Sequence, residues 1–135
     1  MDDAKCRALK AELATQPEPQ VVPIDRFFDG NDDPGSIGCN LDPYPGIARF
    51  RQTLSGLLSR PDVQAVYAQV AELDPGEGCW PFADTVLVVG AIPVADLRAA
   101  VGALQPDEVG PADGSGVPPA VGEWHRSPVS VIWWD

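Results

Sequence analysis

The spacing of hydrophobic residues along the chain predicts three amphipathic helices. Apolar side chains that recur three, four or seven positions apart fall on one face of a helix. Such stripes lie in residues 2–15, 45–58 and 93–104. Their members are Cys6, Leu9 and Leu13, then Ile47, Phe50, Leu54, Leu57 and Leu58, and last Val94, Leu97, Val101 and Leu104. We therefore expect three helices, each with one buried face.

Four other segments are predicted to be strands. Residues 85–89 are continuously apolar, which is typical of a central buried strand. Residues 129–134 alternate at first and then become apolar throughout. Residues 63–73 fit a helical and a strand period, and their recurring β-branched side chains favour a strand. Residues 21–24 predict an extended segment, which Pro23 makes short, irregular or confined to a sheet edge because proline cannot donate to a ladder.

The order of these elements predicts an α+β fold of the ferredoxin-like type. After residue 20 the chain reads strand, helix, strand, strand, helix, strand, which is the βαββαβ pattern. Two right-handed crossovers then place both helices on one face of a four-stranded antiparallel sheet, as a two-layer sandwich. That topology puts the first strand inside the sheet, where Pro23 is disfavoured. We divide the chain into an N-terminal helix with a Pro-rich linker, residues 1–20, and a single α+β domain, residues 21–135.

Composition adds that the chain has the size and apolar content of one globular domain. Its 135 residues are 44% hydrophobic and 21% charged, which does not fit a disordered chain. No apolar run approaches the roughly 18 residues that a membrane helix needs. The charged start at residues 1–7 has no apolar signal core. We therefore expect a soluble, cytoplasmic protein with no membrane partner.

Acidic residues dominate the charge. Twenty Asp and Glu against nine Lys and Arg give a formal net charge of −11, which disfavours nucleic acid and favours a basic partner or a cation. In the predicted topology the loops at residues 29–44, 73–84 and 105–128 meet at one pole. The acids there are Asp29, Asp32, Asp33, Asp42, Glu72, Asp74, Glu77, Asp84, Asp107, Glu108, Asp113 and Glu123. An acidic binding pole and a set of merely solvated loops both stay open.

The sequence contains few cysteine and histidine residues that could bind a metal, and one loop with calcium-like ligand spacing. The three cysteines, Cys6, Cys39 and Cys79, form no CxxC pair and are expected to be reduced, small buried residues. Asp29, Asn31 and Asp33 match the 1-3-5 ligand spacing of a calcium loop, but proline at position six and asparagine at position twelve exclude an EF-hand. Two interpretations of this loop remain: a non-standard cation site, and a rigid turn in which Asx side chains cap backbone amides. No cofactor is predicted.

Catalytic motifs are not evident in the sequence. His125 is the only imidazole, and neither GxSxG nor a phosphate-binding glycine motif is present. In the enzyme alternative, the site is the acidic loop at residues 29–42, with Asp84 and His125 nearby. The alternative for His125 is a surface or hydrogen-bonded side chain.

The aromatic residues suggest binding anchors. Trp80 and Phe82 follow an acidic turn, and tryptophan is enriched at binding hot spots. Trp133 and Trp134 must point to opposite faces of a regular strand. One of them then packs under the helices and the other lies on the open sheet face. The alternative is that the loop at residues 105–128 or the N-terminal helix covers both, which is favoured for Trp133, and Trp134 is retained as the binding candidate on the open face.

Three segments carry a resemblance to a known group. Residues 27–41 (FFDGNDDPGSIGCNL), residues 80–86 (WPFADTV) and the terminal residues 133–135 (WWD) resemble a group of small acidic bacterial proteins of uncharacterised function. The resemblance runs from Val21 to Asp135 and implies no activity. In overall type the chain is similar to immunity proteins of bacterial toxin systems, which are small, acidic and cytoplasmic.

Together these features predict an acidic protein-binding module, with an immunity-type inhibitor of a basic partner as one form of it. A small enzyme or divalent-cation-binding protein, and a dimerising or ligand-binding sandwich that uses its open sheet face, are the alternatives. The sequence does not fix an oligomeric state. The candidate binding residues are Asp29, Asp32, Asp33, Glu77, Trp80, Phe82, Asp84 and Trp134.

Overall fold

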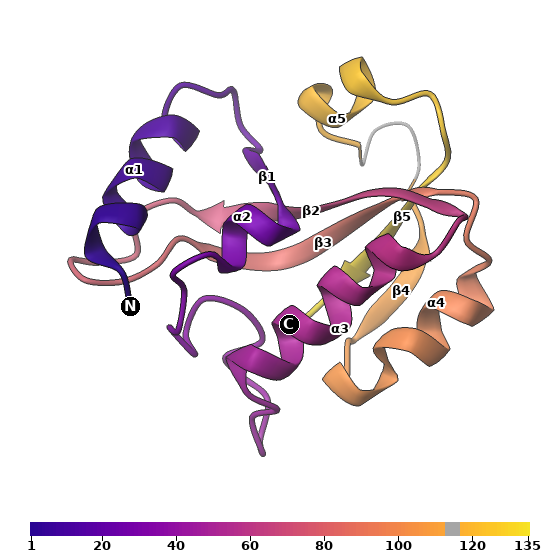
Figure 1. Ribbon diagram of the computed structural model, residues 1–135, viewed down its shortest axis with the longest axis horizontal. Helices are drawn as coiled ribbons and strands as arrows, with labels where there is room; N and C mark the ends of the chain where they lie inside the picture. The colour runs from indigo at the N-terminus through magenta and orange to yellow at the C-terminus, as the bar shows by residue number, and fades with distance from the viewer. Residues whose placement is uncertain (113–116) are drawn as a thin grey trace.

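The computed structural model describes residues 1–112 and 117–135 and has an α+β fold. A five-stranded antiparallel sheet crosses the molecule, and helices pack against it (Figure 1). The strands are β1 (Val21–Pro23), β2 (Val63–Glu72), β3 (Phe82–Gly90), β4 (Glu108–Pro111) and β5 (Val129–Trp133). The helices are α1 (Asp3–Leu13), α2 (Ile24–Phe28), α3 (Ile47–Gly56), α4 (Val94–Val101) and α5 (Pro119–Trp124), with 3-10 turns at Leu57–Ser59 and Gly102–Leu104. The predicted α+β class is confirmed.

The long hairpin of β2 and β3 forms the centre of the sheet. The strand order is β1-β2-β3-β5-β4, and all neighbours are antiparallel. Successive side chains of a strand point to opposite sides. We call the side that carries Val66, Val88 and Ile132 the first face, and the side that carries Tyr67 and Leu87 the second face.

The strand order differs from the predicted ferredoxin-like order. β1 pairs with β2 at an edge of the sheet and does not lie inside it. Pro23 gives the physical reason, because a residue without an N–H is tolerated at an edge and leaves a ladder position empty in the interior. The expected extended path after residue 23 is also replaced by α2, whose Ile24, Phe27 and Phe28 recur at helical spacing and are fully buried.

Part of the predicted loop at residues 105–122 is structured. It contains β4, which pairs with β5, and α5, which begins at Pro119. Both elements are short, and β4 contains Gly110 and Pro111, so neither has a pattern that sequence periodicity can detect. Their positions come from tertiary contacts.

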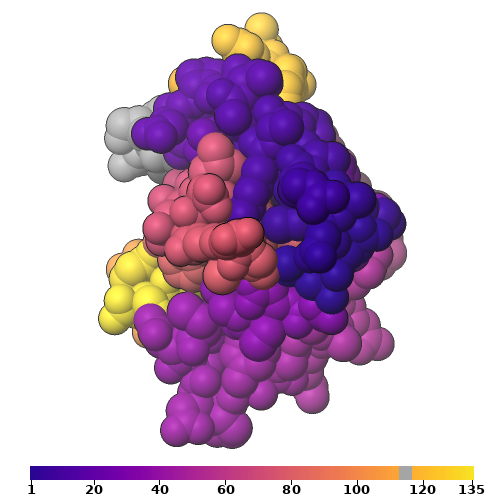
Figure 2. All heavy atoms as spheres, turned by 90° about the vertical axis from the view of Figure 1, so that its left-hand side faces the viewer, coloured from indigo at the N-terminus to yellow at the C-terminus, as the bar shows by residue number. Residues whose placement is uncertain are grey.

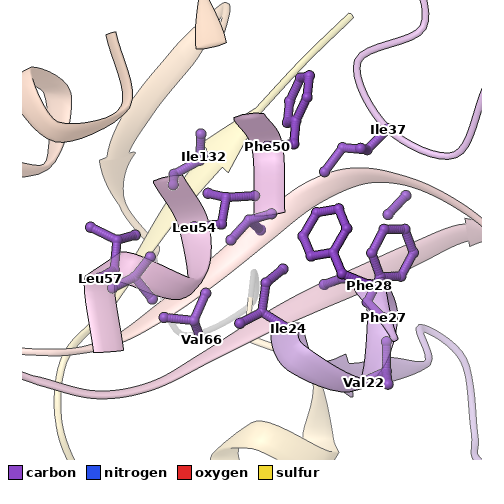
Figure 3. Close-up of a cluster of buried hydrophobic side chains, with 14 of the residues drawn as sticks. Val22, Ile24, Phe27, Phe28, Ile37, Phe50, Leu54, Leu57, Val66 and Ile132 are labelled. Carbon is purple, nitrogen blue, oxygen red and sulfur yellow. The ribbon is translucent and has the colours of Figure 1, made fainter. Parts of the chain in front are cut away.

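The main core lies between the first face and helices α1 to α4 (Figure 3). Phe27 and Phe28 meet edge to face, with ring centroids 5.1 Å apart, and Phe50, Leu54 and Ile132 lie in the same cluster. Burying a side chain of this size contributes about 1.5–3 kcal/mol. The Cys6, Leu9 and Leu13 stripe of α1 joins this core as predicted, so α1 shares the apolar interior of residues 21–135.

A smaller core lies on the second face under α5. Val121 of α5 packs with Tyr67, Leu87 and Val89. Helices therefore cover both faces, α5 adding a partial layer that the predicted two-layer sandwich lacks (Figure 1). Within the described part of the chain, the longest helix has 11 residues, and no helix has the length and apolarity to cross a membrane.

Candidate functional site

The acidic loop that follows α2 is braced by its own side chains. Asn31 Oδ1 accepts the Asp33 N–H at 2.9 Å, and Asn31 Nδ2 donates to Ser36 Oγ at 3.0 Å. Asp33 Oδ1 accepts the Gly35 N–H at 2.8 Å, and Asp33 Oδ2 accepts the Trp80 N–H at 3.0 Å. These bonds confirm the rigid Asx turn, one of the two interpretations of the loop.

Cations of the N-terminal segment, residues 1–13, pair with acids at this end of the molecule. The terminal ammonium of Met1 lies 2.8 Å from Asp32, and Lys5 lies 2.7 Å from Asp29. Lys10 lies 2.9 Å from Asp74 of the β2–β3 hairpin. The hydrogen bond from Lys5 holds the pKa of Asp29 below its ordinary value. The chain thus compensates much of this charge internally.

The three calcium-loop candidates do not converge. Asp29 faces Lys5, Asn31 is buried among backbone and Ser36 contacts, and Asp33 supports the Trp80 amide. Among residues 1–112 and 117–135, no three His, Cys, Asp or Glu side chains are grouped so that they could hold a metal ion.

The predicted acidic pole forms only in part. The predicted loops at residues 29–44 and 73–84 meet at one end, joined by the bridge between Ile37 and Ala83. The C-terminus lies there as well, since Asn40 Nδ2 donates to the Asp135 carbonyl at 2.9 Å. Glu123 does not lie there, because β4 carries the chain to the opposite end of the sheet before α5 begins. Asp113 lies outside the described residues.

The two predicted tryptophan anchors are inside the protein. Trp80 is fully buried, and Trp134 is 2% exposed. Trp134 Nε1 donates to the Leu104 carbonyl at 2.9 Å, and its ring meets Phe50 edge to face. The prediction that Trp134 occupies the open sheet face is therefore wrong, and Trp80 has no surface to offer a partner.

The remaining predicted residues lie close to this end but apart from one another. Glu77 is exposed on the β2–β3 hairpin, facing α1. Phe82 is half-buried at the start of β3. Asp84 accepts the Thr85 hydroxyl at 2.9 Å.

The open part of the second face carries a groove that the sequence analysis did not place. Its volume is about 380 Å³. Gln69, Thr85, Trp133 and Glu108 form one row across β2, β3, β5 and β4. Leu87 and Val131, from the adjacent row, supply the apolar floor. Trp133, which is half-buried, thus takes the open-face position that was assigned to its neighbour.

One carboxylate lines this groove. Glu108 is exposed, and it is the charged side chain of the lining. Asp84 comes one position before Thr85 in β3 and so points to the other face, and Asp107 precedes β4 and accepts the Asp135 N–H at 2.6 Å. Arg98 donates to the Val109 carbonyl at the outer edge of β4.

The other end of the second face holds the single histidine. Tyr67 Oη and His125 Nε2 lie 2.8 Å apart, and burial raises the pKa of Tyr67. Trp124, beside them at the end of α5, is 58% exposed. The 29–42 loop joins the other core through Ile37. The structure therefore does not assemble that loop with His125 as the enzyme alternative requires.

Sequence reasoning missed Trp133, Glu108, Gln69 and Thr85 as a set. The alternation of residues 129–134 shows that the two terminal tryptophans diverge, but not which of them faces the helices. Glu108 lay in an expected loop. Only the pairing of β4 with β5 reveals its position opposite Trp133.

Comparisons with known proteins give one finding. No curated protein and no solved structure matches the chain. A family model, described as the uncharacterized protein YfbO family, matches residues 4–131. The match includes α1 and so begins earlier than the resemblance from Val21 noted in the sequence. Because it covers nearly the whole chain, this protein belongs to the uncharacterized protein YfbO family.

Proposed function

We propose that this protein is a binding module that holds a basic segment of a partner protein in the groove on its second face. One observation carries the proposal: an indole, an apolar floor and a carboxylate line the same open groove. These are Trp133, the pair Leu87 and Val131, and Glu108. Such a site fits an arginine or lysine side chain that has apolar neighbours.

The chemistry of the row supports a cationic occupant. A guanidinium over an indole face gains about 0.5–2 kcal/mol, depending on how far the site is desolvated. The same group can donate to the Glu108 carboxylate, since a charged donor and acceptor make the stronger hydrogen bonds. Gln69, on the same row, supplies an amide for the backbone of the bound segment.

The charge of the whole chain supports the same occupant. A formal net charge of −11 attracts a basic partner over long range and accelerates its association. Two copies of this chain repel each other for the same reason, so a heterologous partner is favoured over a dimer. Inhibition of a basic protein, as an immunity-type module would do, is one use of such binding.

The acidic loop at residues 29–33 is the weaker candidate. Asp29 already faces Lys5 and Asp32 the Met1 ammonium, and both Asp33 oxygens accept backbone N–H groups. A partner would have to displace these contacts before it gained its own. Glu108 has no such partner among the hydrogen bonds and ion pairs of residues 1–112 and 117–135.

Calorimetric titration with an arginine-rich peptide that contains two leucines tests the proposal. We expect saturable binding that weakens as salt is raised. Trp133→Ala should weaken it about tenfold or more, and Glu108→Gln about three- to tenfold. Glu123→Gln removes the same charge at the other end of the molecule and is the matched control.

Equal losses of peptide affinity in Glu108→Gln and Glu123→Gln would contradict the proposal, because they would show that binding depends only on the net charge of the protein. Sedimentation of the free protein adds a second check. A stable dimer that Trp133→Ala dissolves would assign the groove to self-association instead.

A further inference from the structure

Two cysteines that are far apart in the sequence meet between α1 and the β2–β3 hairpin. Cys6 Sγ lies 3.5 Å from the carbonyl oxygen of Cys79, across a separation of 73 residues. That carbonyl carbon is three bonds from the Cys79 sulfur. Figure 2 looks onto this end of the molecule, where the indigo atoms of α1 lie beside the salmon atoms of the hairpin. One thiol therefore already reaches the residue that carries the other.

A cation is fixed beside both thiols. Lys10 follows Cys6 by about one helical turn, and its Nζ is held by Asp74 Oδ1 at 2.9 Å and the Gly76 carbonyl at 3.4 Å. Burial raises the pKa of the Cys6 thiol, and the Lys10 ammonium opposes that rise. An ammonium group in this place stabilises a thiolate as it forms, and the thiolate is the form that reacts.

Small molecules have access to the place where α1 meets the hairpin. A cavity of about 490 Å³ opens between α1 and the hairpin, and Cys6, Lys10, Asp74 and Glu77 are among its lining residues. Cys79 is half-buried, whereas Cys6 is 4% exposed. The more accessible Cys79 is the thiol that an oxidant meets first. The cavity lining mixes the carboxylates Asp3, Asp74 and Glu77 with the cations Met1, Arg7 and Lys10, so a neutral oxidant avoids a preference set by charge.

We propose that Cys6 and Cys79 form a redox modification site in which a low-molecular-weight disulfide converts the two thiols to an intramolecular disulfide. The Cys79 thiolate, having lost its proton to water, attacks one sulfur of the reagent. An S–S bond to Cys79 forms, and the first reagent thiolate leaves. The Cys6 thiolate then attacks the Cys79 sulfur, which releases the second. The protein loses two electrons and two protons, and the reagent is reduced to two thiols.

The bridge would fasten α1 to the hairpin. α1 and the residues just before it carry the Met1, Lys5 and Lys10 cations that pair with Asp32, Asp29 and Asp74. Oxidation would therefore lock the arrangement in which these acids are compensated. The inference is independent of the proposed function, because the groove lies on the second face and Cys6 belongs to the core of the first.

The test uses the Cys39→Ser variant of the full chain, which removes the exposed third cysteine. After treatment with neutral hydroxyethyl disulfide, we expect no thiol reactive to Ellman's reagent in the unfolded protein, a monomer two hydrogen atoms lighter, and a Cys6–Cys79 peptide in a non-reducing digest. The melting temperature should rise by roughly 10 °C and fall back on reduction, because the bridge closes a long loop.

The same treatment of Cys39→Ser/Cys6→Ser should stop at a mixed disulfide on Cys79, which gains the mass of one hydroxyethylthio group. Retention of that adduct in the Cys39→Ser background, where Cys6 is present to displace it, would overturn the inference. Disulfide-linked dimers in that background, or two unreacted thiols, would overturn it as well.

Discussion

Polar side chains of the loop at residues 29–36 make hydrogen bonds and ion pairs within the protein. Asp33 and Asp32 are adjacent and identical in chemistry, yet their surroundings differ. Asp33 supports two backbone amides, one of them in Trp80, while Asp32 is exposed and faces the terminal ammonium. Leaving the N–H of the buried Trp80 without an acceptor costs more free energy of folding than the exposed pair of Asp32 and the terminal ammonium contributes.

Asp33→Ala should therefore destabilise the protein by about 1–3 kcal/mol, because it leaves the N–H group of the buried Trp80 without an acceptor. Asp32→Ala should change stability by less than about 0.5 kcal/mol. Urea unfolding followed by tryptophan fluorescence measures both values. Equal and small effects would mean that the loop is held by its backbone alone.

Individual residues also show how much of the site could be predicted from the sequence. The Asx spacing of Asn31 and Asp33 was readable, and the structure confirms the rigid turn that it predicts. The sequence did not show which face of the sheet Trp133 and Trp134 each occupy. An alternating pattern shows that neighbouring side chains point to opposite faces, but not which of the two faces the helices. Only the Nε1 bond from Trp134 to Leu104 and its packing on Phe50 settle which ring is inside.

At the scale of elements, long periodic segments were predictable and most short ones were not. The stripes of α1, α3 and α4 and the apolar run of β3 carry enough positions to define a period. The short strand β1 was predicted as extended, with Pro23 favouring an edge, but β4 and α5 have six residues or fewer, contain proline and were assigned to a loop. These short elements form because of contacts with segments distant in the sequence. The strand order also depends on such contacts, and the βαββαβ pattern predicted it wrongly.

The attachment of α1 should depend on pH. Because pairing with Lys5 lowers the pKa of Asp29 in the folded state, the pair contributes stability above the ordinary value of 3.8. That contribution is lost as the pH falls through the lowered pKa. Lys5→Met should thus reduce the melting temperature at neutral pH, and its difference from the unsubstituted protein should narrow towards about pH 3.

Arg7→Met is the matched control, since Arg7 lies on the same helix and forms no ion pair within the described residues. Thermal unfolding monitored by circular dichroism across this pH range gives the comparison. A Lys5→Met difference that stays constant with pH would show that the side chain contributes through packing and not through Asp29.

At the scale of the whole molecule, some acids are paired with cations and Glu108 is not. The N-terminal segment covers Asp29 and Asp32 with cations, whereas the second face leaves Trp133 of β5 and Glu108 of β4 in an open groove. The sequence predicted the net charge and its attraction for a basic partner. It could not locate the surface, because that surface is built from four strands whose pairing no single segment encodes.

Nuclear magnetic resonance of the isotope-labelled protein with the arginine-rich peptide tests the central claim most directly. The account predicts that the largest amide shift changes fall on the groove residues Gln69, Thr85, Glu108, Val131 and Trp133, and that the Trp133 indole signal moves with them. Changes centred on residues 29–33 and 74–77, or scattered evenly over the acidic residues, would contradict it.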